Sequence, residues 1–493
     1  MMEIISRYVR EQHAYSKKML MELFCLDENS FVRLVERLKF SNVLNINRSN
    51  DQNSFDFADD DTEIFDIDFN SDRYDYVFNF VGILSVGNIV IKSFPKYISD
   101  KDEPLEEMKE VLDVLNKYNS QESIISLYNG FDNQKEFNLL SVALYLIEDY
   151  YENGVYKNQE RIIENNGDGE ILWDKTINDT FAIIVGNRPV YLELKTLNSN
   201  YNDHDYITML HKFILTDCCN KLKNADLLEL FDIDGLELSD NEIEYFGDKD
   251  YILYRIQKEL NVQFITRKQI LLKTLYLYIE KGRASSDNLG FSLYGTTNFP
   301  NVWEKVCSEV FSNQLHIPLE MLKLPVDLHE DYVNTGDELL DIIEKPIWTS
   351  FDSNKDHEVN HTLIPDLISF FELEGELCFG IFDAKYYDIV LDENNLENNP
   401  GVGDVTKQYL YQLVYNDFIV KHGFTRVTNA FLMPSESESS RIIGQAKMNI
   451  LEGLSNPPLS NIFVIKLSAS KMFKHYLTNK KLDVSGEFDL SNM

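Results

Sequence analysis

The segment spanning residues 363–390, LIPDLISFFELEGELCFGIFDAKYYDIV, constrains the fold more than any other. Two apolar runs, LISFF and CFGIF, flank a Glu374-Gly375 dipeptide that is typical of a tight turn. Strands that are apolar on both faces are typical of the buried centre of a sheet. The segment therefore predicts a central hairpin in a mixed α/β domain, with helices flanking the sheet.

The turn also predicts which polar side chains meet. A two-residue turn at Glu374-Gly375 places Asp366 opposite Asp383, at the same end of the hairpin. Lys385 lies two residues beyond Asp383 and so points from the same face of the strand. Two carboxylates and an ammonium group should therefore lie within a few ångströms of one another.

This grouping suits hydrolysis of a phosphodiester by Mg²⁺, with Mn²⁺ as a possible substitute, and it is the pattern of PD-(D/E)xK nucleases. Asp366 and Asp383 would ligate the metal, which keeps several waters and binds substrate phosphate. Lys385 would orient the attacking water and stabilise developing charge. The spacing alone is common, and the alternative is a structural ion-pair cluster at a strand end. Burying such a cluster without a chemical role would be costly.

Two flanking segments supply further candidates. Residues 299–315 predict a helix with Pro300 in its first turn, and Glu304 is a candidate metal ligand, with a plain surface glutamate as the alternative. Residues 405–420 predict a second helix. Its Gln408, Tyr411 and Gln412 are candidates to hold phosphate or water, with a polar-aromatic packing stripe as the alternative.

A second copy of the motif lies upstream, in Asp179 and the segment YLELKT with Glu193 and Lys195. A turn at Gly186-Asn187 would pair Glu193 with Thr180, which puts Asp179 on the wrong face. Pro189 also interrupts the second strand. This copy is therefore interpreted as an ordinary hairpin with a surface ion pair.

The N-terminal segment, residues 3–46, has two helical patterns separated by DENS, and Asn29 or Ser30 is the expected cap of the second. The spacing is typical of a helix-turn-helix, with Arg33, Arg37 and Lys39 as candidate DNA-reading residues. Packing or partner binding by a plain helix pair is the alternative.

Charge argues against strong DNA binding by the chain alone. Acids outnumber bases 82 to 46, giving a net charge of −36, whereas DNA-binding proteins usually carry a basic footprint. Residues 51–76 are strongly acidic and predict a linker or exposed loop, while residues 440–481 form a locally basic end. Both runs also fit a solvated surface.

The remaining features indicate a cytoplasmic protein. The five cysteines form no CxxC pair, the N-terminus has no signal-peptide pattern, and no stretch of 18 apolar residues would span a membrane. No GxxxxGK[ST] loop is present, so any nucleotide motor should be another chain.

Several segments in order resemble the LlaJI-type restriction endonuclease family, whose members are related to McrC, the nuclease subunit of the modified-cytosine restriction system. The resemblance covers roughly residues 74–420. It is carried by YVFNFVGIL and VIKSFPKYI, ILWDKTI, PVYLELKT, DYITMLH, YGTTNFPNVWEKVC, IPDLI with FDAKYY, and KQYLYQLVY.

The resemblance implies a bacterial defence protein that cuts foreign DNA with Mg²⁺ under the control of an McrB-like AAA+ GTPase. It implies catalytic roles for Asp366, Asp383 and Lys385, together with Glu304, and it permits a dimer or larger assembly through the motor. It also places YLELKT in a partner-facing region rather than the nuclease site.

The expected organisation has three parts. Residues 1–72 form the helix-turn-helix-like module and acidic linker, residues 73–285 a mixed α+β middle domain that docks on the motor, and residues 286–493 the PD-(D/E)xK nuclease domain. Two rival functions are a non-catalytic regulator that stimulates the motor and a nuclease acting on RNA or single strands.

Overall fold

The computed structural model describes residues 4–48, 74–129, 138–157, 159–201, 205–282, 291–333, 336–352, 355–449 and 459–488. Most of the acidic stretch 51–76 and the predicted domain boundary between residues 285 and 286 lie outside these residues. The chain divides into two compact units: unit 1 comprises 1–6, 84–90 and 135–294, and unit 2 comprises 7–83, 91–134 and 295–493. Among the described helices, none has the length and apolarity needed to cross a bilayer.

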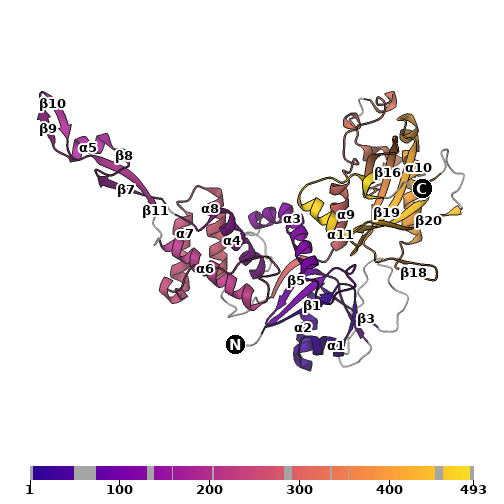
Figure 1. The fold of residues 1–493 in the computed structure, drawn as a ribbon, viewed down its shortest axis with the longest axis horizontal. Coiled ribbons are helices and arrows are strands. Elements are labelled where there is room, and N and C mark those ends of the chain that lie inside the picture. The colour runs from indigo at the N-terminus through magenta and orange to yellow at the C-terminus, as the bar shows by residue number, and fades with distance from the viewer. Residues whose placement is uncertain are drawn as a thin grey trace. The chain divides into compact units, whose positions relative to one another are not determined.

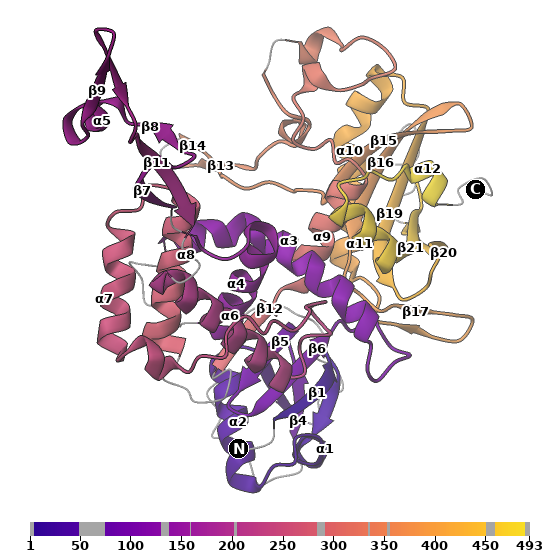
Figure 2. The same ribbon diagram turned by 60° about the vertical axis from the view of Figure 1, so that its left-hand side comes forward.

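Unit 2 is built on a five-stranded mixed sheet (Figures 1 and 2). In spatial order its strands are β15 (Leu367–Leu373), β16 (Glu376–Ala384), β19 (Arg426–Ser435), β21 (Ile462–Ser468) and β20 (Arg441–Ala446). The pairs β16–β19 and β19–β21 are parallel, while the outer pairs β15–β16 and β20–β21 are antiparallel. The predicted mixed sheet is therefore present, and the hairpin β15–β16 is buried as expected. The predicted central position is correct only for β16, because β15 is the edge strand of this sheet.

Alternating side chains of the hairpin enter two different cores, as the two-residue period of a strand requires. Phe379 and Ile381 pack in one core with residues of α10 (Val402–Lys421), including Tyr415. Phe382 points the other way and contacts Phe488, which directly follows α12 (Val484–Glu487). Both faces are thus covered, which explains the continuous apolar runs.

Two more helices complete this part of unit 2: α9 (Phe299–Val310) and α11 (Ala469–Leu477). The indole Nε1 of Trp303 in α9 donates to the carbonyl of Leu432 in β19 at 3.0 Å, and its ring meets Phe473 of α11. Smaller elements are η3 (Leu319–Met321), η4 (Glu330–Tyr332), η5 (Leu339–Ile342), β13 (Ile347–Ser350), β14 (Lys355–Glu358), β17 (Val390–Leu391) and β18 (Leu396–Glu397).

The N-terminal helix pair is present as α1 (Lys17–Leu23) and α2 (Glu28–Phe40). The predicted cap is wrong: Asp27 caps α2, accepting from the Ser30 backbone N–H at 2.8 Å. The helical prediction is also wrong for β1 (Ile5–Arg10) and for β2 (Ala14–Ser16) and β3 (Leu44–Arg48). The last two pair with β4 (Tyr74–Phe78), because β-strand partners far along the chain override local preference.

A turn at Gly87-Asn88 joins the neighbouring strands β5 (Val81–Val86) and β6 (Ile89–Phe94). Gly87 has φ +63°, which favours glycine. These strands form a sheet in the order β1-β6-β5-β12, where β12 is Phe291–Thr296. The helix α3 (Leu105–Asn129) follows β6.

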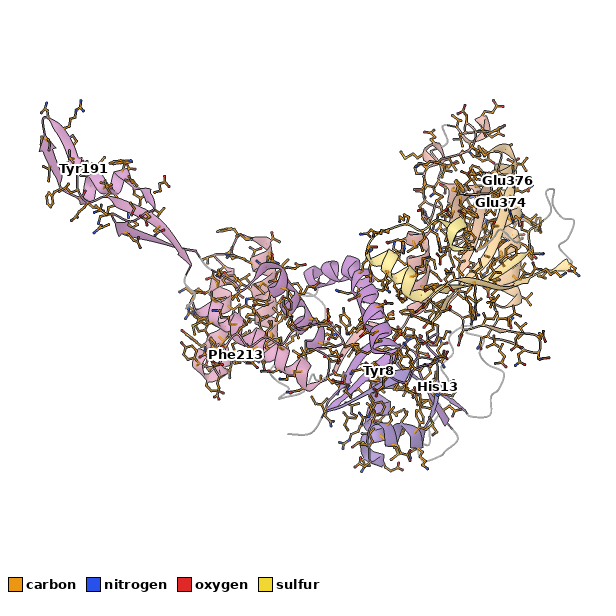
Figure 3. The ribbon with its side chains drawn as sticks, in the orientation of Figure 1. Tyr8, His13, Tyr191, Phe213, Glu374 and Glu376 are labelled. Atoms are coloured by element: carbon orange, nitrogen blue, oxygen red, sulfur yellow. The ribbon has the colours of Figure 1, made fainter. Side chains whose placement is uncertain are left out.

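Unit 1 contains a helical body and an arm that extends from it (Figures 1 and 2). The body comprises α4 (Leu139–Asn153), α6 (Tyr206–Asn224), η1 (Ile243–Phe246), α7 (Lys249–Leu260), α8 (Thr266–Leu277) and η2 (Tyr278–Gly282). The arm comprises β7 (Gln159–Asn165), β8 (Glu170–Ile171), α5 (Trp173–Asp179), β9 (Ala182–Val185), β10 (Arg188–Tyr191) and β11 (Lys195–Tyr201). Tyr191 marks the arm in Figure 3.

Candidate active site

The register of the hairpin is the one the sequence predicts. Leu367 pairs with Phe382 and Leu373 with Glu376, so continuing the ladder by one residue places Asp366 opposite Asp383. Glu374 and Gly375 form the two-residue turn, with φ of 53° and 84°, and Figure 3 shows Glu374 and Glu376 at that end of the hairpin. Both positive φ values are typical of a type I′ turn.

The three central residues meet at the other end of the hairpin. The Lys385 Nζ lies 3.0 Å from Asp383 Oδ2. The Asp366 carboxylate accepts a hydrogen bond from the Ala384 backbone N–H at 2.9 Å. Ala384 stands between Asp383 and Lys385 in the chain. Asp383 is buried and Lys385 is partly exposed, so the cluster is anchored in the sheet yet reachable from solvent.

Sequence reasoning missed a fourth member, Asp404. Its Oδ1 lies 3.3 Å from Lys385 Nζ, so Lys385 is held between two carboxylates. Asp404 belongs to the first turn of α10, where its side chain also accepts from the Gly401 backbone N–H at 3.2 Å. The one available signal was an Asp near a helix start, which is too common to point to this site.

The electrostatics show an excess of acid at the cluster. Burial raises the pKa of Asp366 to about 8, and the charge and hydrogen bonding of Asp383 and the charge of Glu304 add to the shift. Lys385 opposes it. For Lys385 itself burial disfavours the ammonium, but Asp383 and Asp404 outweigh burial and raise its pKa.

Glu304 faces this cluster from α9. Burial raises its pKa, Lys385 lowers it and Asp383 raises it further. The helix has the predicted Pro in its first turn and buries Trp303, Val306, Cys307 and Val310. Glu304 is thus half-buried beside the acids rather than a plain surface side chain.

The three candidates on α10 are placed differently. The Tyr411 hydroxyl donates to the Ile364 carbonyl at 2.9 Å. Burial raises the pKa of Tyr411, and the negative charges of Asp383 and Asp366 raise it further. Gln408 is fully buried, and neither its Oε1 nor its Nε2 has a hydrogen-bond partner among the described residues. Gln412 instead accepts from the Ser460 backbone N–H at 3.0 Å. Phosphate or water binding by these side chains stays a prediction.

The upstream copy of the motif is dispersed. The turn at Gly186-Asn187 is confirmed, with Arg188 paired to Val185. Asp179, however, ends α5 rather than lying on a strand, and Lys195 Nζ bonds the Asn165 side chain at 2.7 Å. The predicted surface ion pair is therefore replaced by a neutral partner.

The candidate basic surfaces differ in exposure. Arg33, Arg37 and Lys39 are exposed on α2, and their DNA-reading role stays a prediction. Several bases of the C-terminal end are paired with acids: Lys466 with Asp388, Lys471 with Glu487 and Lys474 with Glu110. Such pairing reduces the positive potential available to DNA.

The donor set fits Mg²⁺. Within the described residues no three His, Cys, Asp or Glu side chains gather as a metal site. Mg²⁺ needs only one or two carboxylates, because it keeps waters and binds substrate phosphate. Asp366 and Asp383 would provide these hard oxygens. Burial is the main cause of the raised pKa of Asp366, and the nearby charges of Asp383 and Glu304, which a cation would offset, raise it further.

Comparison with known proteins then decides the family. The LlaJI restriction endonuclease family matches residues 80–470. The chain belongs to the LlaJI restriction endonuclease family. It is 29% identical over 426 residues to the type II restriction enzyme BsuMI component YdjA of Bacillus subtilis (strain 168), covering 84% of this chain and 83% of that protein.

Two solved structures give weaker matches. One is a half-complex of Thermococcus gammatolerans McrB AAA+ hexamers with bound McrC, at 12% identity and a TM-score of 0.37, covering 96% of this chain and 99% of that chain. The other is a T. gammatolerans McrBC complex, at 9% identity and a TM-score of 0.22, covering 56% and 79%. These scores are too low to carry an argument.

Proposed function

We propose that this LlaJI-family chain is the nuclease subunit of a bacterial, McrBC-like restriction system that works in the cytoplasm. It hydrolyses phosphodiester bonds in DNA at a PD-(D/E)xK site formed by Asp366, Asp383 and Lys385. Two observations together carry the proposal: the 3.0 Å contact of Lys385 with Asp383 beside the half-buried Asp366, and the chain's membership of a restriction endonuclease family.

Asp366 and Asp383 would hold Mg²⁺, with Glu304 facing the same cluster from α9. The metal supplies polarisation of the phosphate and a more acidic bound water. Lys385 remains protonated because its pKa is raised, so it acts as a cation that orients water and stabilises charge on phosphate. Asp383 and Asp404 hold its ammonium in place from two sides.

The partner is an McrB-like AAA+ GTPase motor that delivers DNA. Two properties of the chain support a partner: its net charge of −36 and the apolar surface of the arm in the predicted docking region. Phe181, Ile184 and Leu192 expose 98%, 66% and 67% of their surface there. Contiguous exposed apolar side chains often mark a protein interface.

The rival function is a non-catalytic regulator of the motor. All three motif residues are present and in contact, which favours a working nuclease. A regulator would still stimulate GTP hydrolysis after the site is altered, but it would cut no nucleic acid.

The test is cleavage of plasmid DNA with Mg²⁺, with and without the motor. We expect Lys385→Ala and Asp383→Ala to lower cutting at least ~10³-fold, since such groups each contribute several kcal/mol to the transition state. Assembly and GTP hydrolysis should be unchanged. Lys421→Ala is the matched control, because Lys421 also lies between two carboxylates, but these belong to the exposed Asp331 and Asp417. Undiminished cutting by either site variant would overturn the assignment.

A further inference from the structure

The loop that follows Lys385 is held by residues from the start of the chain. Tyr386, next to Lys385, is 5% exposed. Its hydroxyl donates to the Glu11 carboxylate at 2.5 Å and accepts from the Lys96 backbone N–H at 3.2 Å. Glu11 directly follows β1, and Lys96 lies just beyond β6. All four residues belong to unit 2.

Aromatic contacts join the same tyrosine to α9. The Tyr386 ring lies 5.1 Å from that of Phe299, the first residue of the helix that carries Glu304. On the upstream side the Lys96 ammonium lies 4.7 Å from the Tyr386 ring centre, and Tyr97 meets the ring edge-on at 6.3 Å. Tyr386 thus has hydrogen-bond, cation–π and aromatic partners at once, which leaves its ring little freedom.

Glu11 is an unusual residue for a purely structural junction. Burial raises its pKa to about 7, even though the Tyr386 hydroxyl and Lys96 both lower it. A buried carboxyl group is costly unless its partners are well placed. Two residues further along the loop, Asp388 forms a second link, with Arg10 at 3.4 Å and Lys466 at 3.5 Å.

We propose that Glu11 and Tyr386 are positioning residues for Lys385, so that the N-terminal segment completes the nuclease site. This inference rests on the proposed function. Tyr386 is covalently next to Lys385, so a shift of its backbone moves the lysine directly. Misplacing a reacting group by about 1 Å can cost roughly 100-fold in rate. Within the part of the chain that the structure describes, neither Glu11 nor Tyr386 hydrogen-bonds to the carboxylates proposed to hold the metal, so their effect passes through the loop.

The test uses the full chain with its motor under conditions in which the wild type cuts. Tyr386→Phe removes only the hydroxyl, and Glu11→Ala removes its acceptor. We expect each to lower kcat about 10-fold or more, with unchanged KM for DNA and unchanged Mg²⁺ affinity by calorimetry. Glu11→Gln keeps an oxygen acceptor and should retain at least about half of kcat, since the Tyr386 hydrogen bond is preserved.

Two controls separate positioning from general damage. Tyr97→Phe alters the neighbouring tyrosine of the same cluster and should cut like the wild type. The double variant Tyr386→Phe with Glu11→Ala should be no slower than the worse single variant, because the two substitutions remove the same hydrogen bond. If Lys385→Ala abolishes cutting but Tyr386→Phe and Glu11→Ala keep full kcat, the positioning inference is wrong. If Lys385→Ala itself still cuts, the proposed function fails instead.

Discussion

At the residue scale, Asp366 links stability to the proposed chemistry. Its pKa of about 8 lies above the ordinary value of 3.8, because the carboxyl group is buried beside Asp383 and Glu304. The folded chain therefore keeps a proton that the unfolded chain has released, and the free energy of unfolding falls as pH rises between these values. The site therefore destabilises the fold most at high pH, where its carboxyl groups are ionised and can bind a cation.

Replacing Asp366 with Asn should expose this cost. Without Mg²⁺ at about pH 9, we expect Asp366→Asn to melt roughly 2 °C or more above the wild type, and the difference should shrink at about pH 5. Mg²⁺ should raise the melting temperature of the wild type but not that of the variant, because only the wild type binds it. Thermal unfolding with and without EDTA measures both effects. An equal Mg²⁺ shift in the two proteins would place the metal elsewhere.

At the element scale, the hairpin β15–β16 owes its register to a turn whose two residues both have positive φ. Glycine adopts this conformation readily, whereas Glu374 is strained by it. The strands then carry Asp366 and Asp383 to one end, while the helices α9 and α10 bring Glu304 and Asp404 to the same place.

Substitutions in the turn should act in opposite directions. Gly375→Ala should reduce the free energy of unfolding by about 1–2 kcal/mol, the cost of a left-handed L-residue. Glu374→Asn should increase it by roughly 0.5 kcal/mol, since Asn-Gly is a preferred type I′ pair. Urea unfolding of the full chain measures both, and Glu376→Asn, just outside the turn, is the control. Stabilisation by Gly375→Ala would contradict the observed turn.

At the scale of the whole molecule, the acidic surface and the paired C-terminal lysines leave little positive potential to attract DNA. Affinity for a duplex depends on neutralised phosphates and falls steeply with salt. If the chain is the nuclease we propose, DNA must be delivered to it, which is why we also propose a motor partner. The exposed apolar arm in unit 1 is the surface we propose for that partner.

The isolated chain should therefore bind duplex DNA weakly, with Kd in the range of non-specific binding, about 10⁻⁴–10⁻⁶ M at physiological salt. Adding the motor and GTP should produce a stable complex. Electrophoretic mobility of a labelled duplex measures both states. Tight binding by the chain alone, in the nanomolar range, would contradict a role for the partner in DNA capture.

The sequence by itself determined the hairpin, its turn and the meeting of Asp366, Asp383 and Lys385, because strand period and turn length relate neighbouring residues through local geometry. It also placed Glu304 correctly on the first turns of an amphipathic helix. It predicted helix where β1 and β3 form strands, because their partners lie far along the chain.

Only the tertiary structure decided which distant groups surround the hairpin. Asp404 reaches Lys385 through the packing of α10, and Glu11 reaches Tyr386 across more than 370 residues of chain. No periodic pattern encodes such contacts, since each is one side chain on an element whose docking is set by the core. The paired lysines, the neutral partner of Lys195 and the burial that raises the pKa of Asp366 follow from the same packing.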